Sequence, residues 1–370
     1  MIWTAIPGFF AAFGLTSLFV YIFNPLARRF GLFDHPGGRK DHADPTPVTG
    51  GLAIAAGTIL PALLVGAPSS SLIGLAVAAA ILLTVGVFDD LHDVRWYYRV
   101  LAQVAAALSI VVIGHVQVAS VGPVFGFHRM ELGELSIPFT VLATVGLINA
   151  LNMCDGIDGL AGSMAFFALV MLAAAAAYAG NIELTDGLCV MAGAVAAFLS
   201  FNMRLPWQPR AKIFLGNSGS AYLGLVIAWA AFRLTQNWGH PVSPVLAPFL
   251  IAPPVIDCLV LMLRRILRRR SPFSADRHHM HHLMLDGGLS VTGVVAGLSA
   301  ISLCLGLAAA IALKVNVPQP YFLLSYLLIG GAYFAWSNNP AAAARSVSRL
   351  VRRGRPAAAQ SPTPAEGSDL

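Results

Sequence analysis

Residues 138–159, PFTVLATVGLINALNMCDGIDG, join an apolar run to a polar end. The apolar part, residues 138–153, has the composition of a helix that crosses a lipid bilayer, which needs about 20 residues of this kind. About eleven runs of similar character occur along the chain. The sequence therefore predicts an all-α integral membrane protein with about eleven transmembrane helices.

The composition of the whole chain supports this class. The protein has 370 residues, of which 57% are hydrophobic and 11% are charged, whereas soluble domains carry roughly 25% charged residues. The predicted spans are 5–27, 49–68, 72–88, 100–118, 138–153, 160–180, 186–203, 213–232, 244–264, 289–312 and 320–337. We expect one polytopic membrane domain over residues 1–340 and a basic, disordered cytoplasmic tail over residues 341–370.

The basic residues predict the orientation of the spans. If the first loop is cytoplasmic and the spans alternate, all but three of the 23 Lys and Arg residues lie on the cytoplasmic side. The exceptions are Arg129, Arg233 and Lys314. Because positive charges concentrate on the cytoplasmic side of membrane proteins, we expect a bacterial inner-membrane protein with a periplasmic N-terminus, a cytoplasmic C-terminus and an active site on the cytoplasmic loops. This topology explains the net charge of +6 without nucleic acid as a partner.

The polar end of the opening stretch is the most specific feature of the chain. Four polar side chains recur there at every third position, and they are Asn149, Asn152, Asp155 and Asp158. If the helix continued, they would lie along one face. Polar groups at the mouth of an apolar span are costly as structure alone, so this ladder predicts a functional site. The glycines at 156 and 159 open the turn and let a ligand approach the backbone.

A pair of carboxylates, Asp89 and Asp90, follows the span at 72–88. Two adjacent carboxylates do not both ionise easily unless a cation lies near them. The pair therefore favours a Mg²⁺ site or an acid–base role. The alternative is a solvated cluster of charges at the membrane edge.

Three further polar segments fall on the same side of the membrane. The turn with Gly216, Asn217 and Ser218 enters a helix and is typical of either a phosphate cradle or a helix cap. The run of histidines at 278, 279, 281 and 282 favours an anion over Zn²⁺, since no thiol or carboxylate partners are evident. Arg39 and Lys40 in the first loop either bind a phosphorylated substrate or anchor the chain. Carboxylates for a metal and basic groups for phosphates, gathered on one face, predict phosphoryl transfer involving a diphosphate.

The motifs, in this order, resemble those of the polyprenyl-phosphate N-acetylhexosamine-1-phosphate transferases, a family related to the phospho-N-acetylmuramoyl-pentapeptide transferase of peptidoglycan synthesis. The resemblance runs from about Gly31 to Leu289 and includes the Asp89–Asp90 pair, the ladder at 149–159 and the turn at 216–220. The run His279-Met-His-His282 is closer to the undecaprenyl-phosphate N-acetylglucosamine (GlcNAc) branch than to the muramoyl-peptide branch, which has a plain triple histidine.

This resemblance implies that a UDP-N-acetylhexosamine gives its sugar-1-phosphate, with GlcNAc-1-phosphate as the first candidate, to undecaprenyl phosphate in the lipid bilayer. UMP is released, and a lipid-linked cell-surface glycan such as O-antigen is initiated. Mg²⁺, with Mn²⁺ as an alternative, would bridge the donor diphosphate. Family members are often homodimers. The catalytic residues implied are Asp89, Asp90, Asp155, Asp158 and His279. The substrate-binding residues implied are Arg39, Lys40, Asn149, Asn152, Gly216, Ser218, Arg265, His281 and His282. The metal ligands implied are Asp89, Asp90 and Asn217.

Asn217 departs from the family pattern, which has aspartate after the glycine of this turn. Either its amide oxygen serves as a ligand without the negative charge, or the metal binds weakly until the donor diphosphate arrives, or the chain is a variant of low activity. Two other functions stay open, namely a silent relative that binds lipid or nucleotide and a transporter, although transporters place ionisable residues near the bilayer midplane in repeated halves. The donor sugar, the glycan pathway and the choice between direct attack and a covalent intermediate also stay open.

Overall fold

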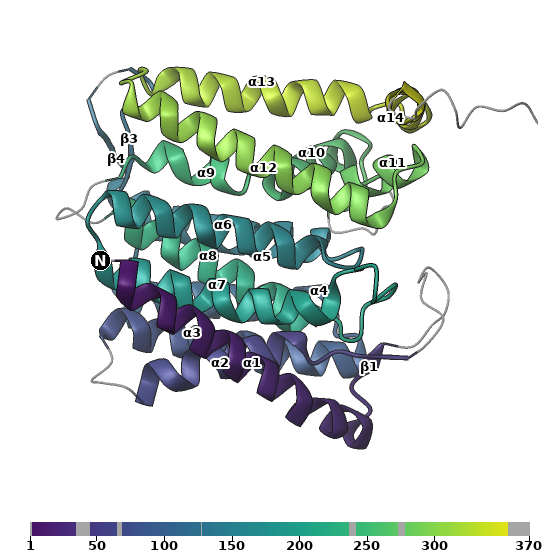
Figure 1. The fold of residues 1–370 in the computed structure, drawn as a ribbon. Helices are drawn as coiled ribbons and strands as arrows, with labels where there is room; N and C mark the ends of the chain where they lie inside the picture. The colour runs from purple at the N-terminus through teal and green to yellow at the C-terminus, as the bar shows by residue number, and fades with distance from the viewer. Residues whose placement is uncertain are drawn as a thin grey trace, which may run out of the picture.

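The computed structural model describes residues 2–34, 45–64, 69–126, 128–236, 242–272 and 278–353. Long helices dominate this part of the chain and run roughly parallel to one another (Figure 1). In chain order they are α1 (Ile2–Phe30), α2 (Gly50–Leu64), α3 (Ser70–His92), α4 (Trp96–Val112), α5 (Ser136–Cys154), α6 (Leu160–Tyr178), α7 (Ile182–Asn202), α8 (Gly216–Thr235), α10 (Ala252–Leu267), α12 (Val291–Lys314) and α13 (Pro320–Ser337). The all-α class is therefore confirmed.

Short elements connect these helices. They are β1 (Phe33–Asp34), β2 (Thr46–Pro47), β3 (Ser120–Gly122), β4 (Met130–Glu131), η1 (Gly133–Leu135), η2 (Pro244–Leu246), α9 (Ala247–Leu250), α11 (Met280–Asp286) and α14 (Pro340–Arg353). The strands form two antiparallel pairs, β1 with β2 and β3 with β4.

Ten of the eleven predicted spans each fall on one helix, but not every helix is long and apolar enough to cross a bilayer unaided. Among the described residues six helices meet that standard, and a bent pair would make a seventh. Helices α2 and α4 are apolar but shorter. Helix α8 begins with a polar turn and carries Arg233 near its end. A multi-pass membrane protein is thus supported, whereas the number eleven stays a prediction.

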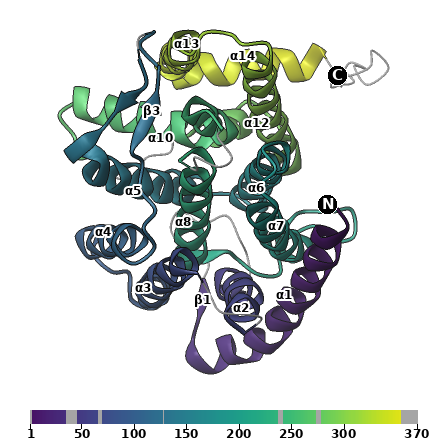
Figure 2. The same ribbon diagram turned by 90° about the vertical axis from the view of Figure 1, so that its left-hand side faces the viewer.

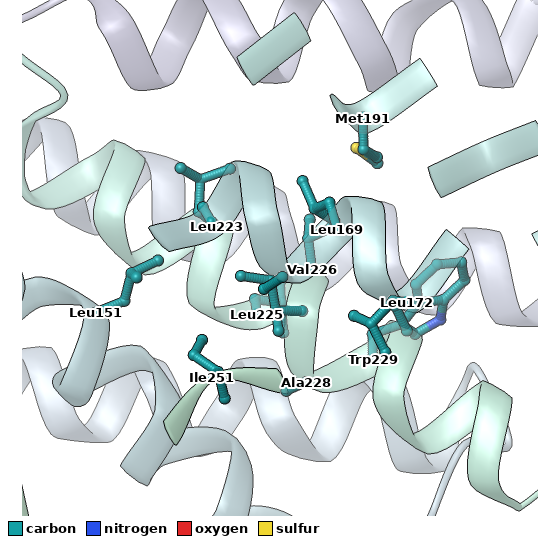
Figure 3. Close-up of a cluster of buried hydrophobic side chains, with 14 of the residues drawn as sticks. Leu151, Leu169, Leu172, Met191, Leu223, Leu225, Val226, Ala228, Trp229 and Ile251 are labelled. Carbon is teal, nitrogen blue, oxygen red and sulfur yellow. The ribbon is translucent and has the colours of Figure 1, made fainter. Parts of the chain in front are cut away.

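Helix α8 is the central helix of the bundle (Figure 2). Most of its side chains are buried, and it packs against α2, α3, α5, α6 and α7. Figure 3 shows its apolar side chains among those of the neighbouring helices, with Leu223, Leu225, Val226 and Trp229 of α8 near Leu151 of α5, Leu169 and Leu172 of α6, and Met191 of α7. A helix that is apolar on all sides belongs in the interior of a fold, and the other helices surround this one.

Two glycines let neighbouring helices approach the first turn of α8. A Cβ on Gly51 of α2 would lie 2.2 Å from the Cα of Gly219, and a Cβ on Gly86 of α3 would lie 2.4 Å from the Cα of Ser218. Small residues allow this backbone-to-backbone contact in membrane helices. The start of α8 is therefore held between α2 and α3.

The ninth predicted span, residues 244–264, is not one continuous helix. The pair formed by η2 with α9 and by α10 bends by 83° at a break near Ile251. Pro253 and Pro254 lie in the first turn of α10, where their missing N–H groups do no harm,. A proline pair that cannot continue a preceding helix can start a new one, and this explains the break.

All the predicted site motifs with described residues lie at one end of the bundle. The turns from α3 to α4, from α5 to α6 and from α7 to α8 meet there, near β1 and α11, whereas β3 and β4 lie at the opposite end (Figure 1). There β3 and β4 pair as a short antiparallel hairpin. Arg39 and Lys40 lie outside the described residues.

The C-terminal tail differs from its prediction. Residues 340–353 form α14, which packs against α11 and the end of α13 (Figures 1 and 2). Its Val347 is buried against Gly287 after α11, and the Ser348 Oγ donates to the Gly287 carbonyl at 2.9 Å. The disorder expected from residue 341 is therefore wrong for 341–353, because alanine and valine give the basic segment one apolar face. Residues 354–370 lie outside the described part.

The contact between α2 and α8 yields a stability prediction. We expect Gly51→Ala to lower the melting temperature in detergent, since the new methyl group forces α2 away from α8 at a cost of about 1–3 kcal/mol,. Gly146→Ala in α5 is the matched control, because nothing lies within 4 Å of the added Cβ. An alanine there should be neutral or stabilise the helix by up to about 1 kcal/mol. Equal melting temperatures for the two variants would contradict the close contact.

Candidate active site

A cleft of about 290 Å³ opens between α3, α4, α5 and α8. It brings together six of the residues chosen from sequence, namely Asp89, Asn149, Asn152, Asn217, Arg265 and His279. It also adds Trp96, Arg99 and Gln103, which sequence reasoning missed. These three recur at helical spacing on α4 directly after the Asp89–Asp90 pair, and that polar stripe in an apolar helix was a usable signal.

Asp89 is paired inside the protein. Its side chain is 1% exposed, and Oδ2 accepts from the Arg99 Nη1 at 3.1 Å. Oδ1 accepts from the backbone N–H of Val94 at 2.8 Å. These bonds fasten the end of α3 to the start of α4. Arg99 is 37% exposed and lines the cleft, so its guanidinium group places positive charge in the cleft wall.

Asp90 caps the central helix. Its Oδ1 accepts from the backbone N–H of Asn217 at 2.8 Å, and its Oδ2 accepts from the N–H and the Oγ of Ser218 at 3.3 and 3.0 Å. A carboxylate at a helix N-terminus satisfies free N–H groups and suits the helix dipole. Gly216, at φ +77°, has no room for a side chain, since a Cβ would lie 2.3 Å from Val48 and 2.8 Å from Asp90. The N–H groups of the expected phosphate cradle are thus already bonded to Asp90.

The ladder at 149–158 divides into two parts. Asn149 and Asn152 lie on one face of α5, as predicted. The Asn149 Nδ2 donates to the Gln103 Oε1 at 2.7 Å, and the Asn152 Nδ2 donates to the Asn217 Oδ1 at 3.0 Å and to the Ser220 Oγ at 2.9 Å. Because α5 ends at Cys154, Asp155 and Asp158 do not continue this face but lie in the following turn.

Asp158 helps to build the turn between α5 and α6. Its Oδ2 accepts from the Arg204 Nε at 2.6 Å, and the Asp158 side chain is only 13% exposed. Beside it, the N–H of Gly159 donates to the Asn202 Oδ1 at 2.8 Å, and the Asn202 Nδ2 donates to the carbonyl of Ile213 at 2.8 Å. The turn is therefore tied to the end of α7 and to the chain that leads into α8.

Asp155 is the open carboxylate of the group. Water reaches its side chain, and it accepts no hydrogen bond from the described residues. Protein surrounds most of the carboxyl, and this enclosure, then the charge of Asp90 and then that of Asp158, raises the pKa of Asp155 to about 7,.

Contact with α10 places the first residue of the run His279–His282 beside the cleft. The Nδ1 of His279 lies 2.8 Å from the Oδ2 of Asp257, and the His279 ring lines the cleft. His281 is buried with its Nε2 facing Gly156, where an added Cβ would lie 2.6 Å away. Burial, then the nearby His282 and His279, lowers the pKa of His281 to about 3. His281 is therefore a neutral group that packs on the Asp155–Gly156 turn, and it does not line the cleft.

The side chains at the start of α8 fit a hard cation by their chemistry. Among the described residues no three of His, Cys, Asp and Glu gather as a metal site. Carboxylate and amide oxygens are nonetheless present on Asp90, Asp155 and Asn217. Asp90 Oδ1 and Asn217 Oδ1 each accept one hydrogen bond and keep a second lone pair,. Mg²⁺ accepts this kind of set, because it binds through one or two carboxylates and keeps several waters.

Comparison with known proteins gives a consistent result. The family model for glycosyl transferase family 4 matches residues 72–235. The chain is 31% identical over 349 residues to an undecaprenyl-phosphate alpha-N-acetylglucosaminyl 1-phosphate transferase of Escherichia coli strain K12, which covers 93% of this chain and 94% of that protein. Proteins of the same name from Salmonella typhimurium strain LT2 and Haemophilus influenzae are 30% and 29% identical, over 95% and 94% of this chain. The similarity covers 96% and 98% of those two proteins.

The charges around Asp155 yield a pH prediction for the metal-free protein. Asp90→Asn removes a negative charge that raises the pKa of Asp155, so this pKa should fall. The measurement is a pH titration of protein labelled with ¹³C at aspartate Cγ, with Asp155→Asn to assign the signal. Asp186→Asn, in α7 near the other end of the bundle, serves as control and should leave the titration unchanged. An Asp155 titration that is unaffected by Asp90→Asn would refute this coupling.

Proposed function

Because this chain belongs to glycosyl transferase family 4, we propose that it transfers a sugar-1-phosphate from a UDP-sugar to undecaprenyl phosphate, releasing UMP. The similarity to the relatives that support this function covers almost the whole length of those proteins. Their names specify N-acetylglucosaminyl 1-phosphate as the transferred group. GlcNAc-1-phosphate is thus the first candidate for the transferred group. The product would begin a lipid-linked glycan, and the enzyme would act as a multi-pass protein of the bacterial inner membrane.

The observation that carries this proposal is the composition of the cleft. One part of its wall is apolar, with Leu82, Val85 and Ile148 from the membrane helices α3 and α5. The other part is basic, with Arg99, Arg265 and His279. An acceptor with a long apolar chain and a phosphate head needs both kinds of wall at one site. The basic wall would also bind the phosphates of the diphosphate donor.

Phosphoryl transfer depends mainly on positioning and on stabilising charge. We assign the binding of phosphate oxygens to Arg99, Arg265 and His279. The amide nitrogens of Asn149 and Asn152 are already donating within the protein. Only their Oδ1 atoms remain for a ligand, so they suit hydroxyl or N–H groups of the sugar or the uracil and not a phosphate.

Asp155 is our candidate for the proton acceptor at the lipid phosphate. Asp89 is paired with Arg99 and Asp90 caps α8, whereas water reaches the Asp155 carboxyl, which lies two residues after Met153 in the wall of the cleft. A raised pKa suits this role, because a general base works best when its pKa is near the working pH, and the second ionisation of a phosphate monoester lies near 6.

Mg²⁺ is the cofactor we propose, with Asp90 and Asn217 as the residues that would hold it. When bound, it would neutralise charge on the donor diphosphate. Asp89, predicted as a ligand, has its charge balanced by Arg99 and is left out of this set. The homodimer implied by the resemblance stays a prediction.

We also propose that the cleft faces the cytoplasm. The site end of the bundle carries Arg204, Arg265 and the other basic residues of these loops, while Arg129, Arg233 and Lys314 belong to the opposite end. Positive charge on the cytoplasmic side would then place the N-terminus in the periplasm.

The function is tested with purified protein, undecaprenyl phosphate, Mg²⁺ and a panel of labelled UDP-sugars. We expect a lipid-linked product and UMP with UDP-GlcNAc. Asp155→Asn should lower turnover by about 10²–10⁴-fold, the usual contribution of a general base, and Asp186→Asn should not. Uptake of a substrate without a lipid-linked product would instead indicate a transporter. Binding of nucleotide or lipid without turnover would indicate a silent relative.

Asn217 yields a separate prediction about the metal. Asn217→Asp keeps an oxygen for the bond from Asn152 and adds a charge at the helix N-terminus,. If the Asn217 Oδ1 is a ligand, the Mg²⁺ concentration for half-maximal turnover should fall by about tenfold, which corresponds to 1.4 kcal/mol. Asn149→Asp adds a charge to the same cleft and serves as control. An unchanged Mg²⁺ requirement in Asn217→Asp, or an equal fall in both variants, would show that position 217 is not a ligand.

A further inference from the structure

A buried carboxylate outside the predicted motifs joins three segments of the chain. Asp257 lies in α10 and is 2% exposed. It accepts from His279 Nδ1 at 2.8 Å, from the backbone N–H of Met280 at 2.9 Å and from the hydroxyl of Tyr333 in α13. An ionisable group within a membrane helix is costly and usually has a function, so this cluster needs an explanation beyond packing.

The cluster fixes the direction of the His279 ring. An ionised carboxylate only accepts hydrogen bonds, so the Nδ1 of His279 carries the proton that it shares with Asp257. The Nε2 is then the ring atom left for a ligand, and the ring itself lines the cleft. Carboxylate partners commonly select the tautomer and the orientation of a functional histidine in this way.

The bonds from His279 and Tyr333 to Asp257 are more than is needed to attach the histidine run to α10. The Met280 N–H bond already attaches the start of α11 to α10. The Tyr333 side chain adds a donor to the carboxylate from a third helix. Its own backbone carbonyl accepts from the Ser337 Oγ, which in turn accepts from the Arg264 Nη2 at 2.7 Å. The network thus holds both the carboxylate and the helix that supports it.

We propose that Asp257 and Tyr333 are positioning residues that present the Nε2 of His279 to a phosphate of the substrate in the cleft. Asp257 determines the tautomer and the ring orientation of His279, and the Tyr333 hydroxyl holds the Asp257 carboxylate in its orientation. This proposal rests on the proposed function, because it gives His279 its ligand.

The principal test compares Asp257→Asn with Tyr333→Phe. In Asp257→Asn the amide can present an N–H to the Nδ1 of His279, which would move the ring proton to Nε2. We expect kcat to fall by about 10²–10⁴-fold, as with other histidines left in the wrong tautomer. Tyr333→Phe keeps the carboxylate, so the tautomer should persist while kcat falls by about tenfold.

The matched control is Tyr326→Phe. Tyr326 lies on the same helix as Tyr333, and its buried hydroxyl has no hydrogen-bond partner among the described residues. Its removal should leave kcat and KM unchanged. The melting temperatures of all three variants in detergent show how much of any loss is unfolding.

A second readout does not depend on turnover. The ¹⁵N shifts of labelled histidine, assigned with His279→Gln, report which ring nitrogen of His279 carries the proton. The wild type should show the proton on Nδ1, and Asp257→Asn should show it on Nε2. Normal kcat in folded Asp257→Asn, or an unchanged tautomer, would overturn the proposal. If the wild type makes no lipid-linked product with any donor, the proposed function fails, whereas the ¹⁵N shifts still decide whether Asp257 sets the ring.

Discussion

The bond between the Asp90 carboxylate and the first turn of α8 is the interaction on which the site depends. It joins the end of α3 to the backbone N–H groups of Asn217 and Ser218. Gly51 and Gly86 allow α2 and α3 to come close enough for this contact. Once α8 is fixed, Asn217 meets Asn152 of α5, and Asp89 on the same turn of α3 meets Arg99 of α4. The cleft is the space that these contacts leave.

Five of the aspartates at the site end divide into two groups. Asp89, Asp158 and Asp257 each face one basic or imidazole side chain inside the protein, namely Arg99, Arg204 and His279. Asp90 faces backbone N–H groups, and Asp155 faces water. A buried ion pair that loses one partner leaves an uncompensated charge, so the paired aspartates mainly fix geometry. Among the aspartates, the proton-transfer chemistry is therefore left to Asp155, whose carboxyl water reaches.

Apolar runs were enough to locate the long helices, and the alternation of the spans was enough to place most motif residues at one end of the bundle. It was not enough to separate the roles of Asp89 and Asp90. Adjacent residues of a helix point about 100° apart, so one faces α4 and the other faces α8. The partners of Asp90 and of His279 lie outside their own motifs, so no local pattern contains them. Arg99, the partner of Asp89, lies close by in the sequence and could have been found. The break before Pro253 was missed because residues 244–256 are apolar throughout, and the proline pair was not considered. The helix at 340–353 was missed because the basic charge of the tail pointed to disorder.

The enclosed position of α8 has a consequence for biogenesis. Each helix that leaves the translocon on its own must be apolar enough to enter lipid, and Asn217 and Arg233 count against α8 in that step,. In the finished protein other helices surround α8, Asn217 bonds to Asn152 of α5, and Arg233 pairs with Glu183 of α7 at 3.3 Å. Helix α8 therefore depends on α2, α3 and α5, which are synthesised before it, for its place in the bilayer. Substitutions that weaken those contacts would first lower the amount of correctly inserted protein, because quality-control proteases remove mis-inserted chains. The molecules that do insert would keep their catalytic rate.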